Sequence, residues 1–439
     1  MQLIKYQATF RARWLVLHRY LALSAGLLMA IIGLTGSVSL YRDTLDTLFN
    51  PALAIERSQG NYQSLDKMLD AVKKVHPDRH GAWTLEMPDA SHDTVTAWFE
   101  KPYETTGQIY APLMVSINPY TAEVVASRLW GQTAMTWLLD LHKQLAWDAL
   151  GWQIVGGVGL LMALSVLSGL YLWWPARKQL FAIFSVQQKS LIKFAFDAHR
   201  LIGLLSALAL LSLALTGLNL SFPQILESFT GSTGMSHGGN GPLILSTAVP
   251  NNRPVKLSEA AFIAKAPFPK AELRRITTPS GVDGTFQVNL RQNSEINQKH
   301  PFTMVWIDRW SGHIKEVRDP AKFSTGEKLM AWMWPLHTGE ALGASGRFIW
   351  FLAGISLFLL YVSGVMRWLH RHGWMRDQAL NFSKFKNYDR TLMAKSQRIM
   401  LMLWRLLGEF IRYATPIVLK ALTAFSRKIS IVWAEWQRR

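Results

Sequence analysis

The stretch "LHRYLALSAGLLMAIIGLTG" at 17–36 has the length and the apolar composition of a membrane helix. It begins, however, with a histidine and an arginine, and such side chains are costly near an apolar span. The segment "AHRLIGLLSALALLSLALTG" at 198–217 repeats the arrangement, with His-Arg standing the same distance before Thr-Gly. A polar pair that recurs at one spacing indicates an internal repeat and a shared role for the two histidines.

The composition is that of an integral membrane protein. The chain has 439 residues, of which 49% are hydrophobic and 19 are tryptophan, with a formal net charge of +18 and no cysteine. The lack of cysteine excludes disulfides, iron–sulfur clusters, thiol catalysis and covalently attached c-type haem. Four stretches exceed the ~18 apolar residues needed to cross a bilayer, and we expect the first to be a retained anchor rather than a signal peptide. These stretches are 14–41, 152–174, 201–222 and 348–368.

Lysine and arginine near the spans predict the orientation in the membrane. They flank the first span on its N-terminal side, the connection between the second and third spans, and the end of the fourth. By the positive-inside rule, we expect both termini to be cytoplasmic and the two long loops to lie on the opposite side of the membrane. The charge of +18 is then a signature of the membrane surface, and a nucleic-acid partner is not expected, since no soluble basic domain carries the charge.

The same repeat extends over the rest of the chain. "VSINPYTAEV" at 115–124 resembles "VWIDRWSGHI" at 305–314, and both are strand–turn–strand patterns. Each half therefore contains a span, an extracytoplasmic α+β module and a second span. Two repeats of the same orientation imply a pseudo-twofold axis along the membrane normal. The predicted segments are a first span (1–41), module 1 (42–147), a second span (148–176), a cytoplasmic connection (177–198), a third span (199–222), module 2 (223–346), a fourth span (347–370) and a basic tail (371–439).

Four histidines become interpretable as two pairs under this symmetry. His18 and His199 stand at the cytoplasmic ends of the first and third spans, whereas His142 and His337 precede the second and fourth spans on the other side. Two facing imidazoles form a bis-axial site for haem b, which needs no cysteine, so we expect two haem b groups per chain. Zinc or copper stays open as an alternative, although carboxylate and thiolate co-ligands are missing there.

Small and cationic residues stand where such haem sites would need them. Thr35 lies about 26 Å along a helix from His18, which places its neighbour Gly36 near the depth of the opposite pair. Small residues permit close approach and leave room for a porphyrin face, and arginines suit haem propionates. The expected cofactor-binding residues are, besides the four histidines, Gly36, Gly217, Gly169, Gly364, Arg19 and Arg200, with His370 and His372 as reserve ligands.

These motifs resemble the PepSY-associated transmembrane family, and in particular its inner-membrane ferrisiderophore reductases. The resemblance rests on the HR…TG spans, the Leu-His before each second span, "SGLYLWWP" at 168–175 and the paired modules, and it covers about 1–376. It implies four spans, periplasmic PepSY-like modules, bound haem b and reduction of Fe(III) carried by a siderophore. The tail at 377–439 departs from the family pattern, and we interpret it as one or two interfacial amphipathic helices.

The expected function is therefore electron transfer across the membrane to a periplasmic ferric siderophore. No nucleotide-binding motif is present, so the electron donor is expected to be a quinol or a separate reductase. Two alternatives stay open. In the first, the PepSY modules bind or regulate periplasmic proteins and peptidases, and the chain has no redox activity. In the second, the chain is a siderophore permease.

Overall fold

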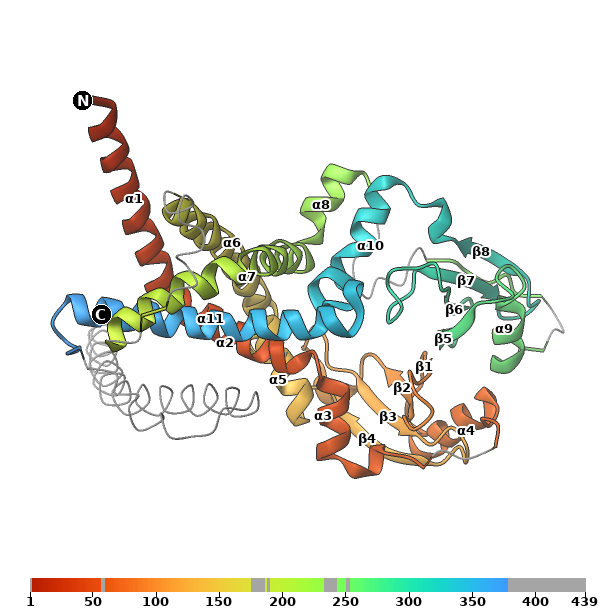
Figure 1. Cartoon of the computed structure of the whole chain (residues 1–439). Helices are drawn as coiled ribbons and strands as arrows, with labels where there is room; N and C mark the ends of the chain where they lie inside the picture. Colours follow the sequence, from red (N-terminus) through yellow and green to blue (C-terminus); the bar gives the residue numbers. More distant parts are fainter. Residues whose placement is uncertain are drawn as a thin grey trace, which may run out of the picture. The chain divides into compact units, whose positions relative to one another are not determined.

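The computed structural model describes residues 2–56, 60–174, 186–187, 190–232, 243–249 and 253–377. The chain divides into two compact units, and the fold and site described here lie in the first, which comprises Met1–Gln187 and Ile192–Arg376 (Figure 1). Half of the predicted connection at 177–198 and nearly all of the predicted tail at 371–439 fall outside the described residues.

Three helices are long and apolar enough to cross a membrane. They are α6 (Asp148–Trp173), α7 (Leu191–Ser221) and the segment Glu340–Arg371, most of which is α11 (Gly343–Arg371). A fourth candidate consists of two helices, α1 (Gln2–Ser24) and α2 (Gly26–Ser39), which meet at a bend of 58°. The described chain therefore has three membrane-spanning candidates, or four if the bent pair is one span.

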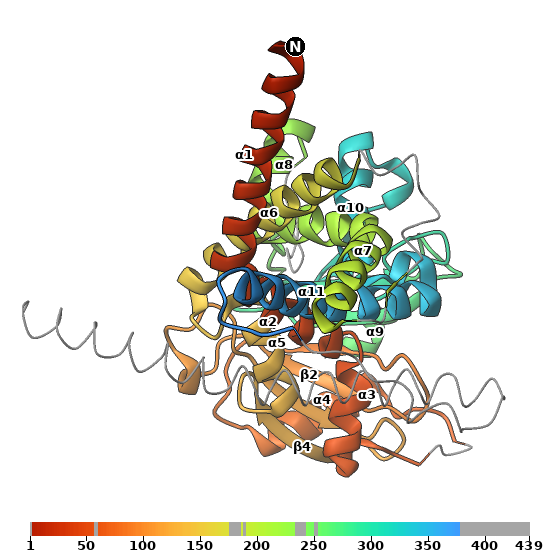
Figure 2. The same ribbon diagram turned by 60° about the vertical axis from the view of Figure 1, so that its left-hand side comes forward.

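The first apolar segment is bent and does not form one continuous helix. The break falls at Ala25, between a serine and a glycine, a combination at which helices often kink. The Ser24 hydroxyl donates to the Tyr20 carbonyl at 2.7 Å, and the Gly26 backbone packs against the ring of Tyr361. Figure 2 shows α1 leading away from the bundle while α2 runs alongside α11.

The remaining helices flank the spans or cover the modules. Helices α5 (Ala134–Gln144) and α10 (Thr325–Thr338) precede α6 and α11, while α3 (Arg42–Phe49) and α8 (Pro223–Thr230) follow α2 and α7. Helices α4 (Leu65–Val75) and α9 (Leu257–Ala264) belong to modules 1 and 2. Side-chain caps fix several starts, because Ser64 accepts from the Lys67 amide and Thr133 forms a capping box with Thr136.

The two modules together form one continuous antiparallel sheet of eight strands, a junction that the sequence does not predict. The strand order is β4-β3-β2-β1-β5-β6-β7-β8, so each module contributes four neighbouring strands. The junction pairs β1 with β5, and Leu85 stands opposite Ile276. The strands are β1 (Thr84–Glu86), β2 (Val95–Phe99), β3 (Leu113–Ile117), β4 (Val124–Leu129), β5 (Glu272–Thr277), β6 (Thr285–Arg291), β7 (Thr303–Asp308) and β8 (Ile314–Arg318).

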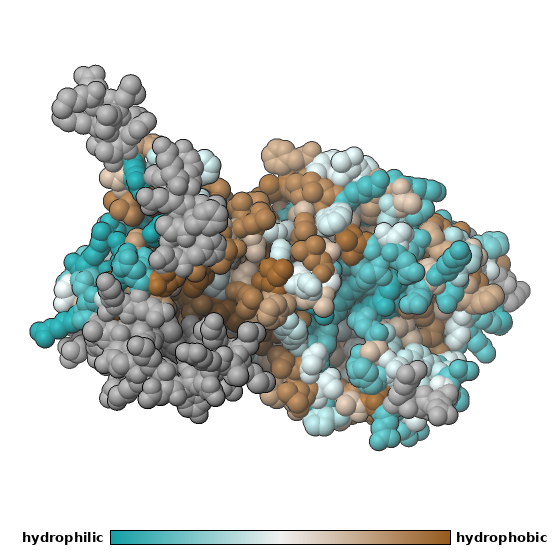
Figure 3. Space-filling view, viewed as in Figure 1, coloured by the Kyte–Doolittle hydropathy of each residue, from teal (hydrophilic) through white to brown (hydrophobic). Residues whose placement is uncertain are grey.

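The two faces of this sheet have different environments. Helices α4 and α9 cover one face, where the main apolar core includes the fully buried Trp83, Leu85 and Ile276 (Figure 1). The other face carries polar and aromatic side chains such as Glu86 and Trp98, because residues alternate between faces along a strand. In Figure 3, apolar residues gather over the long helices, and hydrophilic residues gather over the sheet modules.

Candidate functional site

The first histidine pair joins the two halves of the chain through α1 and α7. The ring centroids of His18 and His199 are 6.4 Å apart. His18 Nδ1 lies 2.9 Å from the hydroxyl of Ser168 on α6, and His199 Nδ1 lies 2.9 Å from the hydroxyl of Ser363 on α11. Each imidazole is thus held by a buried serine of the other long helix in its own half.

The second pair is formed by the helices that precede the later spans. The ring centroids of His142 on α5 and His337 on α10 are 6.2 Å apart. His142 Nδ1 lies 2.9 Å from the backbone carbonyl of Ile32 on α2, and His337 Nδ1 lies 3.0 Å from the hydroxyl of Thr216 on α7. The structure therefore brings together both pairs that the repeat predicts.

The hydrogen bonds fix the tautomer of His142 and favour the same tautomer for the other three histidines. The Ile32 carbonyl can only accept, and the hydroxyls of Ser168, Ser363 and Thr216 each donate to a helix carbonyl at 2.6–2.8 Å. A hydroxyl whose proton is already donated accepts from the imidazole, which favours the hydrogen on Nδ1 at these three histidines as well. The nitrogen left without a proton is Nε2, which is the arrangement of a metal-binding histidine oriented by a second hydrogen bond.

The spacing of each pair fits a haem iron between the rings. In a bis-histidine haem, each metal–nitrogen bond is about 2 Å long, and each nitrogen lies about 1.1 Å from the centre of its ring. The two ring centroids are therefore separated by roughly 6 Å. Both observed separations, 6.4 Å and 6.2 Å, agree with that value. Among the described residues, no group of three or more His, Cys, Asp or Glu side chains could hold a metal ion, whereas a bis-histidine haem requires only two.

The four predicted glycines lie against the imidazole rings themselves. A Cβ atom at Gly36 would lie 2.6 Å from His142 Cε1, and one at Gly217 would lie 3.1 Å from His337 Cε1. The corresponding distances to the Cε1 atoms of His18 and His199 are 3.3 Å from Gly169 and 3.9 Å from Gly364. In the structure, the glycines thus make room for the histidine rings, whereas the sequence suggested room for a porphyrin face.

Burial affects the charge of the second pair. Desolvation lowers the pKa of His142, and desolvation together with the neighbouring His142 lowers the pKa of His337. Both imidazoles are therefore neutral at pH 7, the form that binds iron.

The remaining candidates have different surroundings. Arg19 and Arg200 follow the histidines of the first pair, and the Arg200 guanidinium lies 5.7 Å from the centre of the Phe196 ring. The reserve ligands are engaged by their own segment, because His370 Nδ1 bonds to the Met375 carbonyl and His372 Nδ1 bonds to that of Trp368. The structure does not place either of them in a histidine pair.

Sequence reasoning missed two classes of supporting group. The sequence analysis assigns no role to the Ser168 and Ser363 hydroxyls, although polar side chains at equivalent places in two apolar spans are a signal for a hydrogen-bonding role. The Ile32 carbonyl leaves no trace in the side-chain sequence, because every residue has a backbone carbonyl.

A known family matches most of the chain. The family described as PepSY-associated TM region matches residues 15–371. The chain belongs to this family. No protein of curated function matches the chain. All four paired histidines lie inside the PepSY-associated region, and so do both modules and the whole eight-stranded sheet.

Proposed function

We propose that this PepSY-associated protein is an inner-membrane di-haem b oxidoreductase that passes electrons across the bilayer to an Fe(III)–siderophore in the periplasm and releases Fe(II). The observation that carries the proposal is the shared geometry of the four histidines. The Nδ1 atom of each histidine lies within hydrogen-bond distance of a hydroxyl or carbonyl oxygen, and the ring of each lies beside a second histidine ring at the separation that a bis-axial haem requires.

The chain's own residues have distinct tasks in this function. His18 and His199 would hold one haem, and His142 and His337 would hold the other. Haem supplies reversible one-electron chemistry, and the protein supplies ligation, orientation and burial. The hydroxyls of Ser168, Ser363 and Thr216 and the backbone carbonyl of Ile32 would each keep one imidazole in one tautomer and one orientation.

We infer four spans with cytoplasmic termini, and a pseudo-twofold axis along the membrane normal. The strand order supports the symmetry, because the first strand of each module (β1 and β5) lies at the centre of the sheet and the last strand of each module (β4 and β8) lies at an edge. On α7, His199 and Thr216 lie about 26 Å apart at 1.5 Å per residue, which supports a separation of the two pairs across the bilayer. The modules then lie in the periplasm beside the His142–His337 pair, where the acceptor is reduced.

The electron donor is a separate molecule on the cytoplasmic side or in the membrane. The sequence has no glycine-rich dinucleotide fingerprint between a strand and a helix, so a quinol or a partner reductase supplies the electrons. NADPH alone is therefore expected to leave the purified protein oxidised.

The test is reoxidation of the dithionite-reduced protein by a ferric hydroxamate siderophore, with Fe(II) detected by ferrozine. The expected result is Fe(II) formation by the wild type and its loss in His337→Ala, while the haem at His18 and His199 stays reducible. Reoxidation by a different periplasmic acceptor, with every ferric chelate ignored, would keep transmembrane electron transfer and refute the siderophore assignment.

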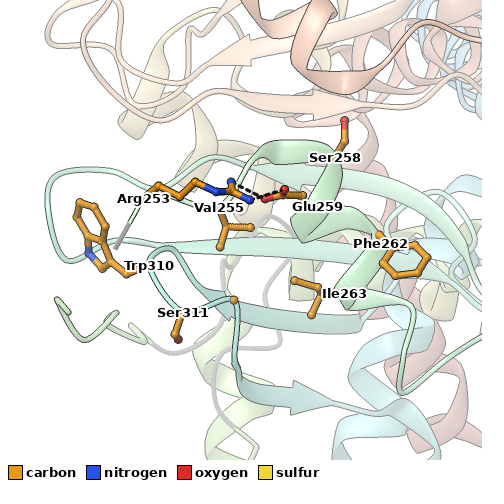
Figure 4. Close-up of a pocket in the computed structure, with 9 residues that line it drawn as sticks. Arg253, Val255, Ser258, Glu259, Phe262, Ile263, Trp310 and Ser311 are labelled. Carbon is orange, nitrogen blue, oxygen red and sulfur yellow. Dashed lines mark hydrogen bonds and ion pairs between the residues drawn. The ribbon is translucent and has the colours of Figure 1, made fainter. Parts of the chain in front are cut away.

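A second candidate function is protein binding by the modules without redox chemistry. It is favoured by a cavity of about 630 Å³ on module 2, lined by α9 and by the turn between β7 and β8 (Figure 4). Phe262, which is 81% exposed, and Trp310 line this cavity and suit an apolar peptide. A purified protein that has no Soret band and binds a periplasmic protein would favour this function over haem-dependent reduction.

A further inference from the structure

An ion network connects the two modules on the face of the sheet that looks away from α4 and α9. All three of its carboxylates belong to module 1, and four of its five cations belong to module 2. Glu86 on β1 pairs with Arg274 at 2.6 Å and with Arg275 at 3.0 Å, both on β5. The complete shared ion network consists of Arg42, Arg274, Arg275, Arg291 and Lys299 with Asp43, Glu86 and Asp89.

The shared ion network has more cations than anions. Asp43 forms ion pairs with both Arg42 and Lys299, and Asp89 forms ion pairs with both Arg274 and Arg291. Five cations thus share three carboxylates, which leaves two positive charges without a matching carboxylate in the network. The neighbouring carboxylates of Asp46 and Asp140 each pair with a cation outside the network. Glu100, whose charge acts on Tyr110 as do those of Arg275 and Arg42, forms no ion pair among the described residues.

These cations are largely withdrawn from water. The side chain of Arg274 is 3% exposed, that of Lys299 is 19% exposed and that of Arg275 is 24% exposed. The Arg275 Nε atom is buried and has no hydrogen-bond partner in the part of the chain that the structure describes. Partly buried and unbalanced cations are costly unless an anion approaches them, and a buried donor calls for an acceptor.

Aromatic contacts connect the shared ion network to the helices of the second histidine pair. On the α5 side, Lys143, which follows His142, lies over the rings of Tyr110 and Trp130, and Arg42 lies over Trp130. On the α10 side, His300 accepts from Arg275 and packs edge-on against Trp334 at 5.0 Å. The positive surplus thus lies between the sheet and the two helices that carry His142 and His337.

We propose that the shared ion network is a binding site for the anionic oxygens of a ligand that carries carboxylates or similar groups. Two sources offer this chemistry. One is the pair of propionates on a haem held by His142 and His337, and the other is an anionic ferric chelate that docks as electron acceptor. Only the naming of these sources rests on the proposed function, since the charge surplus and the Arg275 donor do not depend on it.

The experiment uses the full chain in detergent and has two arms. In the first, calorimetry measures the binding of gallium(III) citrate, an anionic and redox-inert chelate. In the second, haem-free protein is titrated with haem b and with its dimethyl ester, which lacks charged propionates, and the Soret band reports binding. Because charge-assisted hydrogen bonds are strong, we expect Arg275→Gln to lower the affinity for the anionic ligand at least about tenfold. Arg275→Lys is expected to restore part of that affinity.

The matched control is Arg253→Gln. Arg253 forms an exposed two-point ion pair with Glu259 at the rim of the module 2 cavity, on the face covered by α4 and α9 (Figure 4). This variant is expected to bind like the wild type in both arms. If Arg275→Gln fails to fold by gel filtration, Lys299→Gln replaces it, because its partner Asp43 is 58% exposed and the pair lies nearer to solvent.

The outcomes separate the two sources and the two hypotheses. If Arg275→Gln weakens only the binding of gallium citrate, the site belongs to a docking chelate. If Arg275→Gln weakens the binding of haem b but not that of its dimethyl ester or of gallium citrate, the site belongs to the propionates. Chelate binding that depends on Arg275 in a protein that takes up no haem supports the anion site while the proposed function fails. Unchanged binding in both arms for folded Arg275→Gln and Lys299→Gln overturns the inference.

Discussion

His18 and His199 come from opposite halves of the chain, yet their ring centroids lie 6.4 Å apart and each Nδ1 is 2.9 Å from a serine hydroxyl of its own half. Two independent hydrogen bonds therefore hold the two imidazoles next to one another. Hydrogen bonds of this kind orient the histidine ligands of metal sites and reduce the cost of ordering them.

The first prediction concerns cofactor content. The full chain purified from haem-replete cells is expected to be red and to contain two low-spin haem b groups that dithionite reduces. The reason is the presence of two bis-histidine pairs with a common tautomer. A pyridine haemochrome assay with protein quantification measures the stoichiometry. A colourless preparation would contradict the prediction.

The second prediction concerns pairing. His18→Ala and His199→Ala are expected to remove the same haem, because the two rings face each other, and His142→Ala is expected to remove the other. Low-temperature spectra of the reduced proteins separate the two haems. His372→Ala is the matched control and should retain both, since His372 is exposed and bonds to the Trp368 carbonyl. Loss of different haems from His18→Ala and His199→Ala would refute the pairing.

The third prediction concerns the distance between each glycine and the neighbouring histidine ring. Gly36→Ala is expected to displace His142 and to lower occupancy of that haem, because the new Cβ would lie 2.6 Å from the ring. Gly364→Ala is expected to leave the haem at His199 unchanged, because 3.9 Å is an ordinary contact. Haem occupancy after gel filtration provides the measurement, and equal effects of the two substitutions would count against it.

The fourth prediction concerns the hydroxyl that orients a ligand. Ser363→Ala is expected to weaken haem binding about 10–100-fold, because His199 loses the acceptor that fixes its tautomer. Ser356→Ala is the matched control, since this serine is also buried on α11 but its hydroxyl bonds only within its own helix, to the Ala353 carbonyl. The measurement is the rate of haem transfer to apomyoglobin. Identical rates for the two variants would exclude an orienting role for Ser363.

The fifth prediction concerns pH. Burial opposes ionisation of Glu86, but the guanidinium groups of Arg275 and Arg274 outweigh burial and hold its pKa below the usual 4.5. A lowered carboxyl pKa contributes stability that is complete above pH 4.5 and is lost as the pH falls through the folded-state pKa. Glu86→Gln is therefore expected to cost about 3 kcal/mol at pH 7.

The difference between wild type and Glu86→Gln should shrink below pH 4.5, where the wild-type carboxyl also becomes neutral. Apparent unfolding temperatures across pH 3–8 provide the measurement. Glu259→Gln is the control and should change little, because that ion pair is exposed at the surface of module 2. A constant difference between wild type and Glu86→Gln over the whole pH range would refute the assignment.

The repeat explains why much of the site could be predicted from sequence. His-Arg and Leu-His at recurring spacings predict which histidines form pairs, and the ring centroids of the two predicted pairs lie 6.4 Å and 6.2 Å apart. The bend at Ala25 could not be predicted, because Ser-Ala-Gly is tolerated inside many straight helices. The shared ion network was also missed, since Glu86 meets Arg275 only when the two modules join, and no local pattern records that junction.

The junction between β1 and β5 has a further consequence. Strand β1 is the innermost strand of module 1 and β5 that of module 2, so each half would expose a bare sheet edge without the other. A half-length chain would satisfy that edge by associating with a second copy of itself. Covalent fusion of the halves makes this association intramolecular, so it no longer depends on protein concentration, and every histidine pair is completed within a single polypeptide.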